Sequence, residues 1–400
     1  MKRAAALGLM LIGCGSSTPE TGDEVRIGLL LPYTGKDGSA GANYERGVLM
    51  AAERVNAAGG LHQRRLRIVY ADTHSDVARG ADGAKSLVDQ GVVAIIGPED
   101  DELARELSTT LGEADVALLT PSSSSVKSAD ALWFRLAPSA KDLGIALARL
   151  VKTDGAKRIA IVSTTAVYEQ SFASGAKERL TGDGIAPQTS QVIAARSSNF
   201  SEAIDAIRAT QPDAIVLAAD ASTGSRFVNE YAFSARTEGV HWYLSPSLEH
   251  QAFVLNSLPD VTENMTGVAP DVNRNGTQSA EFNGAFASRW GGVTPTTGAY
   301  FYYDALALYA IAYEGAAKDS GSDPPPSADV RTHLLAADSG LVVEWDELAK
   351  GLERASEGKP VNYSGVTGVI KIGEKTGTRA NISTRYWTIR GGQIAPLEQE

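Results

Sequence analysis

Side chains able to carry out catalysis or to bind a metal are scarce in this sequence of 400 residues. It holds a single cysteine, Cys14, and five histidines, no two of which have the i, i+4 spacing of a helical metal pair. It also lacks a G-x-S-x-G nucleophile elbow, a G-x-x-x-x-G-K-[ST] phosphate loop and an H-E-x-x-H pair. We therefore predict a protein that is not an enzyme and that needs no metal or cofactor.

Two clusters of polar residues that follow short apolar runs are better candidates, for binding rather than catalysis. Pro98-Glu99-Asp100-Asp101 follows the apolar run Val92–Ile96, and Thr120-Pro121-Ser122-Ser123-Ser124-Ser125 follows Val116–Leu119. Each cluster has a simple structural alternative. Asp100 or Asp101 can cap the helix that begins there, and the serines can form a solvated turn.

The composition excludes some partners. Lysine and arginine total 37 against 48 aspartate and glutamate residues, which gives a net charge of −11 at pH 7. Such a surface lacks the positive field that nucleic-acid phosphates require, so we expect no nucleic-acid partner. The length and the 43% hydrophobic content indicate a folded chain of roughly two to three domains.

The N-terminus predicts export and anchoring. Lys2 and Arg3 precede Ala4–Gly13, an uncharged stretch half as long as the ~20 residues of a membrane span but typical of a signal peptide. Leu11-Ile12-Gly13-Cys14 resembles the bacterial lipobox, which implies a signal peptide at 1–13 and lipidation of Cys14. Residues 14–24 would then be a flexible tether, and the protein a membrane-anchored lipoprotein of the periplasm or cell envelope. The alternative is a stray cysteine in a secreted protein.

Alternation of strands and helices predicts the architecture that must position the polar clusters. Val25–Leu31 is typical of a strand, and the apolar residues of Ala42–Ala58 recur with a helical period. Helices inserted between short apolar strands imply a parallel sheet that is covered on both faces. A second series of the same kind runs from Leu143 to Leu244, so we predict two lobes. The remainder, Gly267 to Glu400, would supplement both sheets.

The ordered motifs of the chain resemble those of the type I periplasmic solute-binding proteins of the leucine/isoleucine/valine group, the receptors of branched-chain amino-acid ABC importers. The motifs that carry the resemblance are Ile27–Gly35, Ala52–Asp72, Ile95–Pro98, Thr120–Ser124, Phe134-Arg135, Arg158–Tyr168, Asn199-Phe200 with Pro212-Asp213, Tyr303–Ala305 and Gly365–Ile372. The resemblance implies an α/β fold of two Rossmann-like lobes with parallel sheets, three interlobe crossings and a ligand cleft between the lobes.

The resemblance also implies where the domains divide. Lobe 1 would comprise residues 25–137 plus 267–362, and lobe 2 residues 138–266 plus 363–400. The chain would cross near Leu136–Ala140, Gly267–Asp271 and Tyr363–Thr367. Binding would close the hinge between the lobes.

Several site residues follow from the resemblance alone. Ser122 and Ser124 correspond to the donors that hold the ligand carboxylate, and Tyr168 to a cleft tyrosine, although Tyr168 could also be a half-buried packing residue. Other positions depart from the family pattern. They are Asp101 in place of a hydroxyl, Asp220 in place of an aromatic residue, and Ser247, two residues before Glu249, in place of the carboxylate that binds the ammonium group.

These departures leave two hypotheses for the ligand site and two for the protein. Either the acidic charge has moved to Asp220 and keeps an ammonium site, or the site no longer recognises α-amino acids. The protein would be a receptor that binds a small polar solute, an amino acid or a similar molecule, for the membrane permease of an ABC importer. The alternative is a ligandless or sensory interaction lipoprotein that partners a cell-envelope protein. In either case we expect a monomer.

Overall fold

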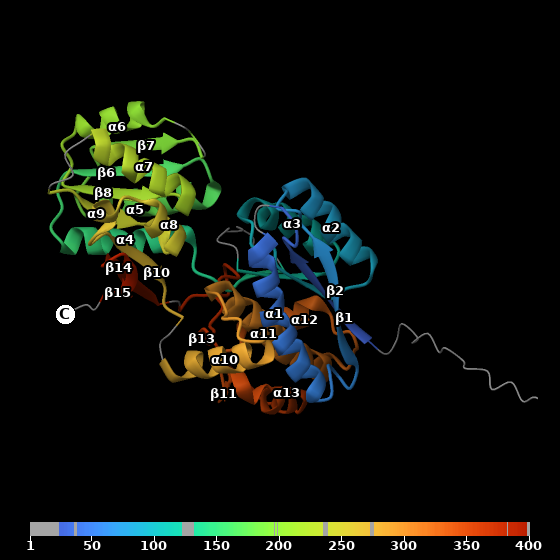
Figure 1. Ribbon diagram of the computed structural model, residues 1–400. Helices are drawn as coiled ribbons and strands as arrows, with labels where there is room; N and C mark the ends of the chain where they lie inside the picture. Colours follow the sequence, from blue (N-terminus) through green and yellow to red (C-terminus); the bar gives the residue numbers. More distant parts are fainter. Residues whose placement is uncertain are drawn as a thin grey trace, which may run out of the picture.

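Two α/β lobes lie side by side, each built on its own sheet (Figure 1). The computed structural model describes residues 24–35, 38–121, 132–195, 197, 199–234, 239–272, 276–381 and 383–397. Cys14 and the expected signal peptide lie outside the described residues, as do Ser122 and Ser124. Glu24, expected as the last residue of the tether, is instead the first residue of β1.

The first lobe contains a five-stranded, all-parallel sheet in the order β2-β1-β3-β4-β5. Its strands are β1 (Glu24–Leu31), β2 (Arg65–Asp72), β3 (Ala94–Ile96), β4 (Ala117–Thr120) and β5 (Trp133–Arg135). Successive side chains of β1 enter opposite cores: Ile27 and Leu29 join one, and Leu30 joins the other. The apolar run is therefore buried on both faces, as a parallel sheet requires.

Helices cover both faces of this sheet. The core on one face includes α1 and α11, and the core on the other includes α2 and α3. A small sheet of β11, β12 and β13 and the helices α12 and α13 complete the lobe (Figure 1). The bounds are α1 (Gly38–Ala57), α2 (Val77–Asp89), α3 (Asp101–Glu113), α10 (Gly276–Arg289), α11 (Thr297–Ser320), α12 (Ser327–Leu335), β11 (Leu341–Glu344), the 3-10 helix η2 (Trp345–Glu347), α13 (Leu348–Ser356), β12 (Val361–Gly365) and β13 (Gly368–Val369).

The second lobe contains a seven-stranded sheet in the order β15-β14-β10-β9-β8-β6-β7. The five strands from β10 to β7 are parallel, and β14 and β15 add two antiparallel strands at one edge. The bounds are β6 (Ile159–Thr164), β7 (Thr189–Ile193), β8 (Ala214–Ala218), β9 (His241–Leu244), β10 (Thr266–Pro270), β14 (Thr384–Arg390) and β15 (Gln393–Pro396).

Helices again pack on both faces, with α4 and α5 in one core and α6, α7 and α8 in the other. The helical bounds are α4 (Ala140–Thr153), α5 (Val167–Gly182), α6 (Ser201–Arg208), α7 (Ala221–Ser234), the 3-10 helix η1 (Pro246–Leu248), α8 (Gln251–Asn256) and α9 (Pro259–Thr262). The predicted fold class, two lobes with covered parallel sheets, is confirmed. Among the described residues, no helix has both the length and the apolar content that a membrane crossing needs.

The structure corrects two of the expected domain boundaries. The boundary at Gly267 falls inside β10, which pairs with β9 and β14 in the second sheet. The third crossing does not lie near Tyr363–Thr367, because β12 and β13 belong to the first lobe and the Arg379 N–H donates to the Arg135 carbonyl at 2.8 Å. The tail therefore stays with lobe 1 beyond residue 362. We propose crossings just before α4, just after β10 and just before β14.

Candidate ligand-binding cleft

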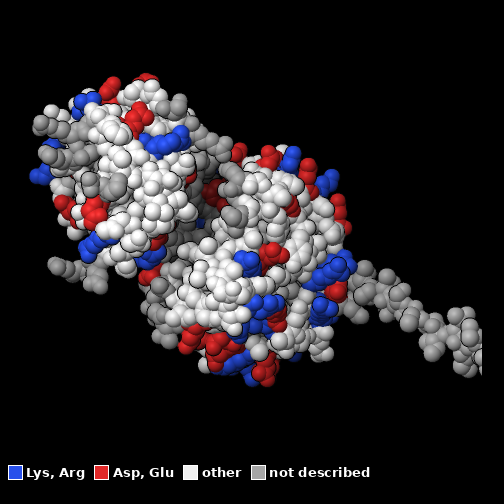
Figure 2. Space-filling model, in the orientation of Figure 1, with Lys and Arg blue, Asp and Glu red and all other residues white. Residues whose placement is uncertain are grey.

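Loops from both lobes meet in the space between them. Asp101 follows β3 of the first lobe, and Tyr168 and Glu169 follow β6 of the second. The Asp101 carboxylate nevertheless lies near enough to Tyr168 and Glu169 to influence both residues electrostatically. Because parallel strands end at the same edge of a sheet, the loops after β8 and β9 open on the same space. Figure 2 shows the surface hollowed between the lobes, with acidic side chains inside the hollow.

Asp101 is the first residue of α3 and is 9% exposed. The helix cap that the sequence suggested is Asp100, whose carboxylate accepts a hydrogen bond from the Leu103 N–H at 2.8 Å. The Asp101 side chain is thus not needed as the cap, and its charge acts on Arg135 within its own lobe and on Tyr168 across the cleft.

Tyr168 lies in the first turn of α5, directly beyond the carboxyl end of β6. Its ring is partly buried and packs against the core that α4 and α5 form with the sheet. Burial, followed by the nearby carboxyl groups of Glu169 and Asp101, raises the pKa of the Tyr168 phenol well above its ordinary value. The hydroxyl therefore stays protonated at neutral pH and can donate a hydrogen bond.

Glu169 is a cleft residue that the sequence did not single out. It follows Tyr168 in the first turn of α5 and is only 5% exposed. Burial, with a smaller contribution from Asp220 and Asp101, raises the pKa of Glu169 to about 7. The carboxyl group is therefore poised between its neutral and charged forms at physiological pH.

The surroundings of Glu169 leave one of its oxygens available. The hydroxyl groups of Ser247 and Ser245 face the carboxyl group and limit the rise of its pKa. Across the described part of the chain, nothing forms a hydrogen bond with Glu169 Oε2. A buried carboxylate oxygen without a partner is costly, so this atom is a candidate to receive a donor from a ligand.

Asp220 follows β8 and caps α7. Its Oδ1 atom accepts hydrogen bonds from the Ser222 N–H at 3.0 Å and the Thr223 N–H at 2.9 Å. Burial opposes ionisation of this carboxyl group, but the hydrogen bonds from Thr223 and Ser222 outweigh it and lower the pKa of Asp220. Asp220 therefore carries a full negative charge at neutral pH, at the place where the sequence predicted a relocated acidic residue.

The loop after β9 places its two polar residues in different environments. Ser247 lies in η1 with its hydroxyl directed to Glu169. Glu249 instead forms an ion pair with Arg385 of β14, with 2.6 Å between Glu249 Oε1 and Arg385 Nη2. The carboxylate that follows Ser247 in the sequence is therefore engaged away from Glu169.

The described cleft is more acidic than basic. Asp101, Glu169 and Asp220 are its acidic groups. The buried cation near them is Arg135, which is 5% exposed, interacts electrostatically with Asp101 and has its Nη2 atom 3.8 Å from Asp142 Oδ2. Burial lowers the pKa of Arg135, and the charges of Asp142 and Asp101 partly compensate. Within the described residues, no group of three or more histidine, cysteine or acidic side chains could hold a metal ion. The arrangement can bind polar and cationic groups through hydrogen bonds and ion pairing.

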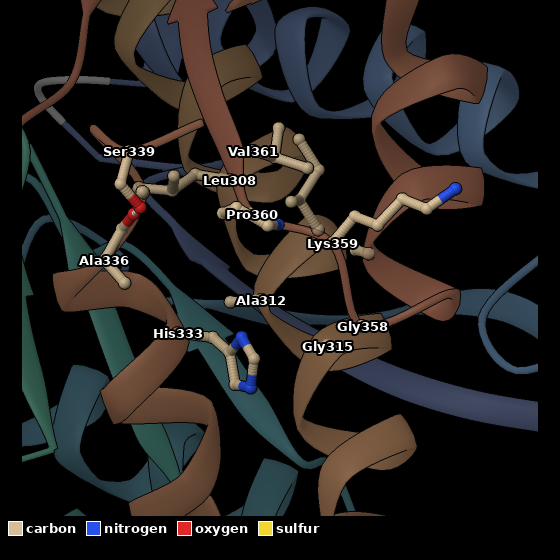
Figure 3. A pocket seen from close by; sticks show the side chains of 13 residues that line it. Leu308, Ala312, Gly315, His333, Ala336, Ser339, Gly358, Lys359, Pro360 and Val361 are labelled. Atoms are coloured by element: carbon tan, nitrogen blue, oxygen red, sulfur yellow. Dashed lines mark hydrogen bonds between the residues drawn. The ribbon is translucent and has the colours of Figure 1, made fainter. Parts of the chain in front are cut away.

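A separate cavity of about 160 Å³ lies inside the first lobe, among α11, α12, α13 and β12 (Figure 3). Its walls are largely apolar, with Leu308, Ala312 and Val361 among the lining residues. His333 also lines it and pairs with Asp319, with 3.0 Å between His333 Nε2 and Asp319 Oδ2. None of the site residues that the sequence suggested lines this cavity, so we do not assign the ligand to it.

The sequence contained one signal for Glu169, the cleft residue that was not predicted from it. Glu169 lies beside Tyr168, immediately after a strand that ends at the cleft. An acidic residue in the first turn of a helix is ordinarily a solvated group that favours the helix dipole. Only the tertiary structure shows that Glu169 is buried beneath the loop after β9, and that Ser245 faces it there.

A two-lobed α/β chain with a polar cleft at the carboxyl ends of its strands has an architecture in which ligands bind between the lobes. A family model described as "Periplasmic binding protein" matches residues 24–377. The chain belongs to this family, whose members are receptors rather than enzymes. The resemblance in the sequence and the prediction of a non-enzymatic protein are both confirmed at this level.

Individual relatives agree with the family. An "Amino acid binding protein" of Pseudomonas aeruginosa is 25% identical over 342 residues, which cover 83% of this chain and 88% of that protein. A "Leu/Ile/Val-binding protein BraC3" of Rhizobium johnstonii is 24% identical, over 48% of this chain and 53% of its own length.

Solved structures share the fold. A putative branched-chain amino acid ABC transporter protein from Silicibacter pomeroyi has a TM-score of 0.73 and 21% identity, covering 92% of this chain and 94% of that chain. The LivJ protein of Streptococcus pneumoniae, solved in complex with isoleucine, has a TM-score of 0.70 and 19% identity, covering 93% and 97%. At these levels of sequence identity, the similarity to the solved structures shows a shared fold.

Proposed function

We propose that this protein is a lipid-anchored, extracytoplasmic solute-binding receptor of an ABC importer. It would bind a small polar metabolite, an amino acid or an amino-acid-like solute, in the interlobe cleft and close around it. The observation that carries this proposal is the buried Glu169 carboxyl group, which has an oxygen without a described partner beside Tyr168 and Ser247. Such a group is expected where a ligand supplies the missing donor.

The relatives support the same solute class. The Pseudomonas protein is named for amino-acid binding and aligns over most of both chains. The LivJ structure holds isoleucine on the same fold. In this chain Tyr168 can donate a hydrogen bond, and the negative charge of Asp220 can attract an ammonium group.

An interaction lipoprotein on the same fold remains the second candidate. It is favoured by the same residues that depart from the family pattern, Asp101, Asp220 and Ser247. A cleft that served no solute would need its buried groups satisfied by the protein itself. Glu169 Oε2, which receives no hydrogen bond from the described residues, argues for the receptor.

Thermal-shift measurements with amino acids, amines, amides and short peptides test the proposal. A solute that binds only the folded protein stabilises it by RT ln(1 + [L]/Kd), about 2.7 kcal/mol at one hundred times Kd. Solutes that raise the melting temperature should also reduce the radius of gyration in small-angle X-ray scattering, because the lobes close. If no compound shifts the melting temperature and an experimental structure shows a filled cleft, the interaction lipoprotein is the better description.

A further inference from the structure

Three carboxyl groups from three different elements converge on the cleft. Asp101 begins α3, Glu169 lies in the first turn of α5, and Asp220 caps α7. The charges of Asp220 and Asp101 both reach Glu169. The other polar side chains around Glu169 are Tyr168 on the same helix and Ser245 and Ser247 in the loop after β9. None of these three carries a positive charge at neutral pH.

On the first-lobe side of the cluster, the buried cation Arg135 lies near Asp101. Arg135 interacts electrostatically with Asp142 and Asp101, whereas the charged groups that act on Glu169 are Asp220 and Asp101. Glu169 and Asp220 remain as two acidic groups in the second lobe. Asp220 receives two N–H groups of α7, whereas Glu169 Oε2 receives no hydrogen bond from any described residue.

We propose that Glu169, within electrostatic reach of Asp220 and Asp101, forms a subsite for a cationic amine, so that the preferred solute carries one more positive charge than an aliphatic amino acid. Basic amino acids and short diamines are the chemical class that fits. The inference rests on the proposed receptor function and specifies its substrate.

The physical reason is the environment of the Glu169 carboxyl group. Burial removes water from this carboxyl group, and two neighbouring acids disfavour its charge. An ammonium group in contact with Oε2 would supply both the missing donor and the compensating charge. The methyl end of an aliphatic side chain would supply neither and would leave the oxygen buried without a partner.

Isothermal titration calorimetry with matched solutes tests the subsite. Lysine and norleucine share their α-amino-acid group and chain length and differ in the terminal ammonium group, as putrescine and butylamine do. We expect lysine to bind at least tenfold more tightly than norleucine, or putrescine than butylamine. Aliphatic members that bind as tightly as their cationic partners would overturn the subsite and leave the receptor function standing. Binding of no solute at all would overturn both.

Variants locate the effect at Glu169. Glu169→Gln keeps the side-chain shape and should reduce the preference for the cationic member to less than threefold. Asp220→Asn removes a negative charge and should weaken the preference in the same direction. Asparagine also caps helices well, so this variant should keep the start of α7. Glu178→Gln, on the same helix but in an exposed pair with Lys141, removes the same charge and should leave the preference unchanged. An unchanged preference in both cleft variants would overturn the proposal.

The pH dependence provides a second readout. Since the pKa of Glu169 is about 7, the fraction of charged carboxylate rises about tenfold between pH 6 and pH 8. The affinity for the cationic solute should increase by up to that factor over this range, with release of a proton on binding. Glu169→Gln should remove this dependence, and a flat profile in the unmodified protein would contradict the proposal.

Discussion

At the scale of single residues, the buried carboxyl group of Glu169 lowers the stability of the folded protein at neutral pH, and the proposed ligand would compensate for this cost. Its pKa rises from 4.5 to about 7 on folding, so the folded state binds more protons than the unfolded state between these values. Stability therefore falls as the pH rises from about 4.5 to about 7, by up to roughly 3 kcal/mol. A group kept at such a cost in a cleft is more readily explained by binding than by folding.

Tyr168 gives the residue-scale prediction. Tyr168→Ala removes both the partly buried ring and the hydroxyl, so we expect the affinity for the solute with the largest thermal shift to fall more than tenfold, or by about 1.4 kcal/mol. Calorimetry measures the change. Phe233→Ala, which truncates an aromatic ring that is 81% exposed, serves as the control and should have no effect. Unchanged affinity in Tyr168→Ala would exclude Tyr168 from the site.

At the scale of elements, a buried carboxylate of α11 holds the β12–β13 hairpin against the first lobe. Asp304 is fully buried and accepts hydrogen bonds from the N–H groups of Val366 and Thr367, each at 2.8 Å. The Thr367 hydroxyl donates at 2.6 Å and the Tyr363 hydroxyl at 3.1 Å. A methyl group at position 365 would overlap this carboxylate, which explains Gly365. The contact keeps the segment beyond residue 362 in lobe 1.

The element-scale prediction follows from these four donors. Asp304→Ala leaves them buried without an acceptor and should lower the free energy of unfolding by about 3 kcal/mol or more. Tyr363→Phe removes only one of the hydrogen bonds and should cost about 1 kcal/mol. Urea denaturation followed by circular dichroism measures both. Equal, small losses in the two variants would mean that Asp304 does not anchor the hairpin.

At the scale of the whole molecule, the crossings connect two lobes that each have complete cores. The chain passes just before α4, and the two remaining connections run together, since the Asp271 N–H donates to the Ser383 carbonyl at 2.8 Å. Among the described elements, the approach of α3 to α5 is the main contact between the lobes apart from these segments. Such an arrangement is the one that the proposed closure on a solute requires, because the lobes can then move as bodies about the crossings.

Anchoring is the prediction that concerns the molecule as a whole. Cys14→Ser removes the expected site of lipidation and should shift the protein from the membrane fraction to the soluble fraction. The reason is that the body itself carries a net negative charge, which anionic headgroups repel. Immunoblotting of fractionated cells measures the distribution, and Ser17→Ala in the expected tether should leave it unchanged. Membrane association that persists in Cys14→Ser would exclude lipid anchoring through this residue.

The sequence by itself determined the local and repetitive features. Alternating apolar strands and amphipathic helices predicted two covered parallel sheets, because the periodicity of burial is a property of neighbouring residues. The same reasoning placed Asp101 after a strand and predicted an acidic cap, Asp100 or Asp101, at the start of α3, whereas Tyr168, Asp220 and Ser247 followed from the resemblance to the family.

Only the tertiary structure decided which of these groups face one another. Glu249 is engaged by Arg385, 136 residues away in the chain, and Glu169 is covered by residues of the loop after β9. The second crossing follows β10 because this strand pairs with β14. The burial and the charge state of these side chains depend on contacts between segments that are distant in the sequence. The local pattern of residues does not predict such contacts.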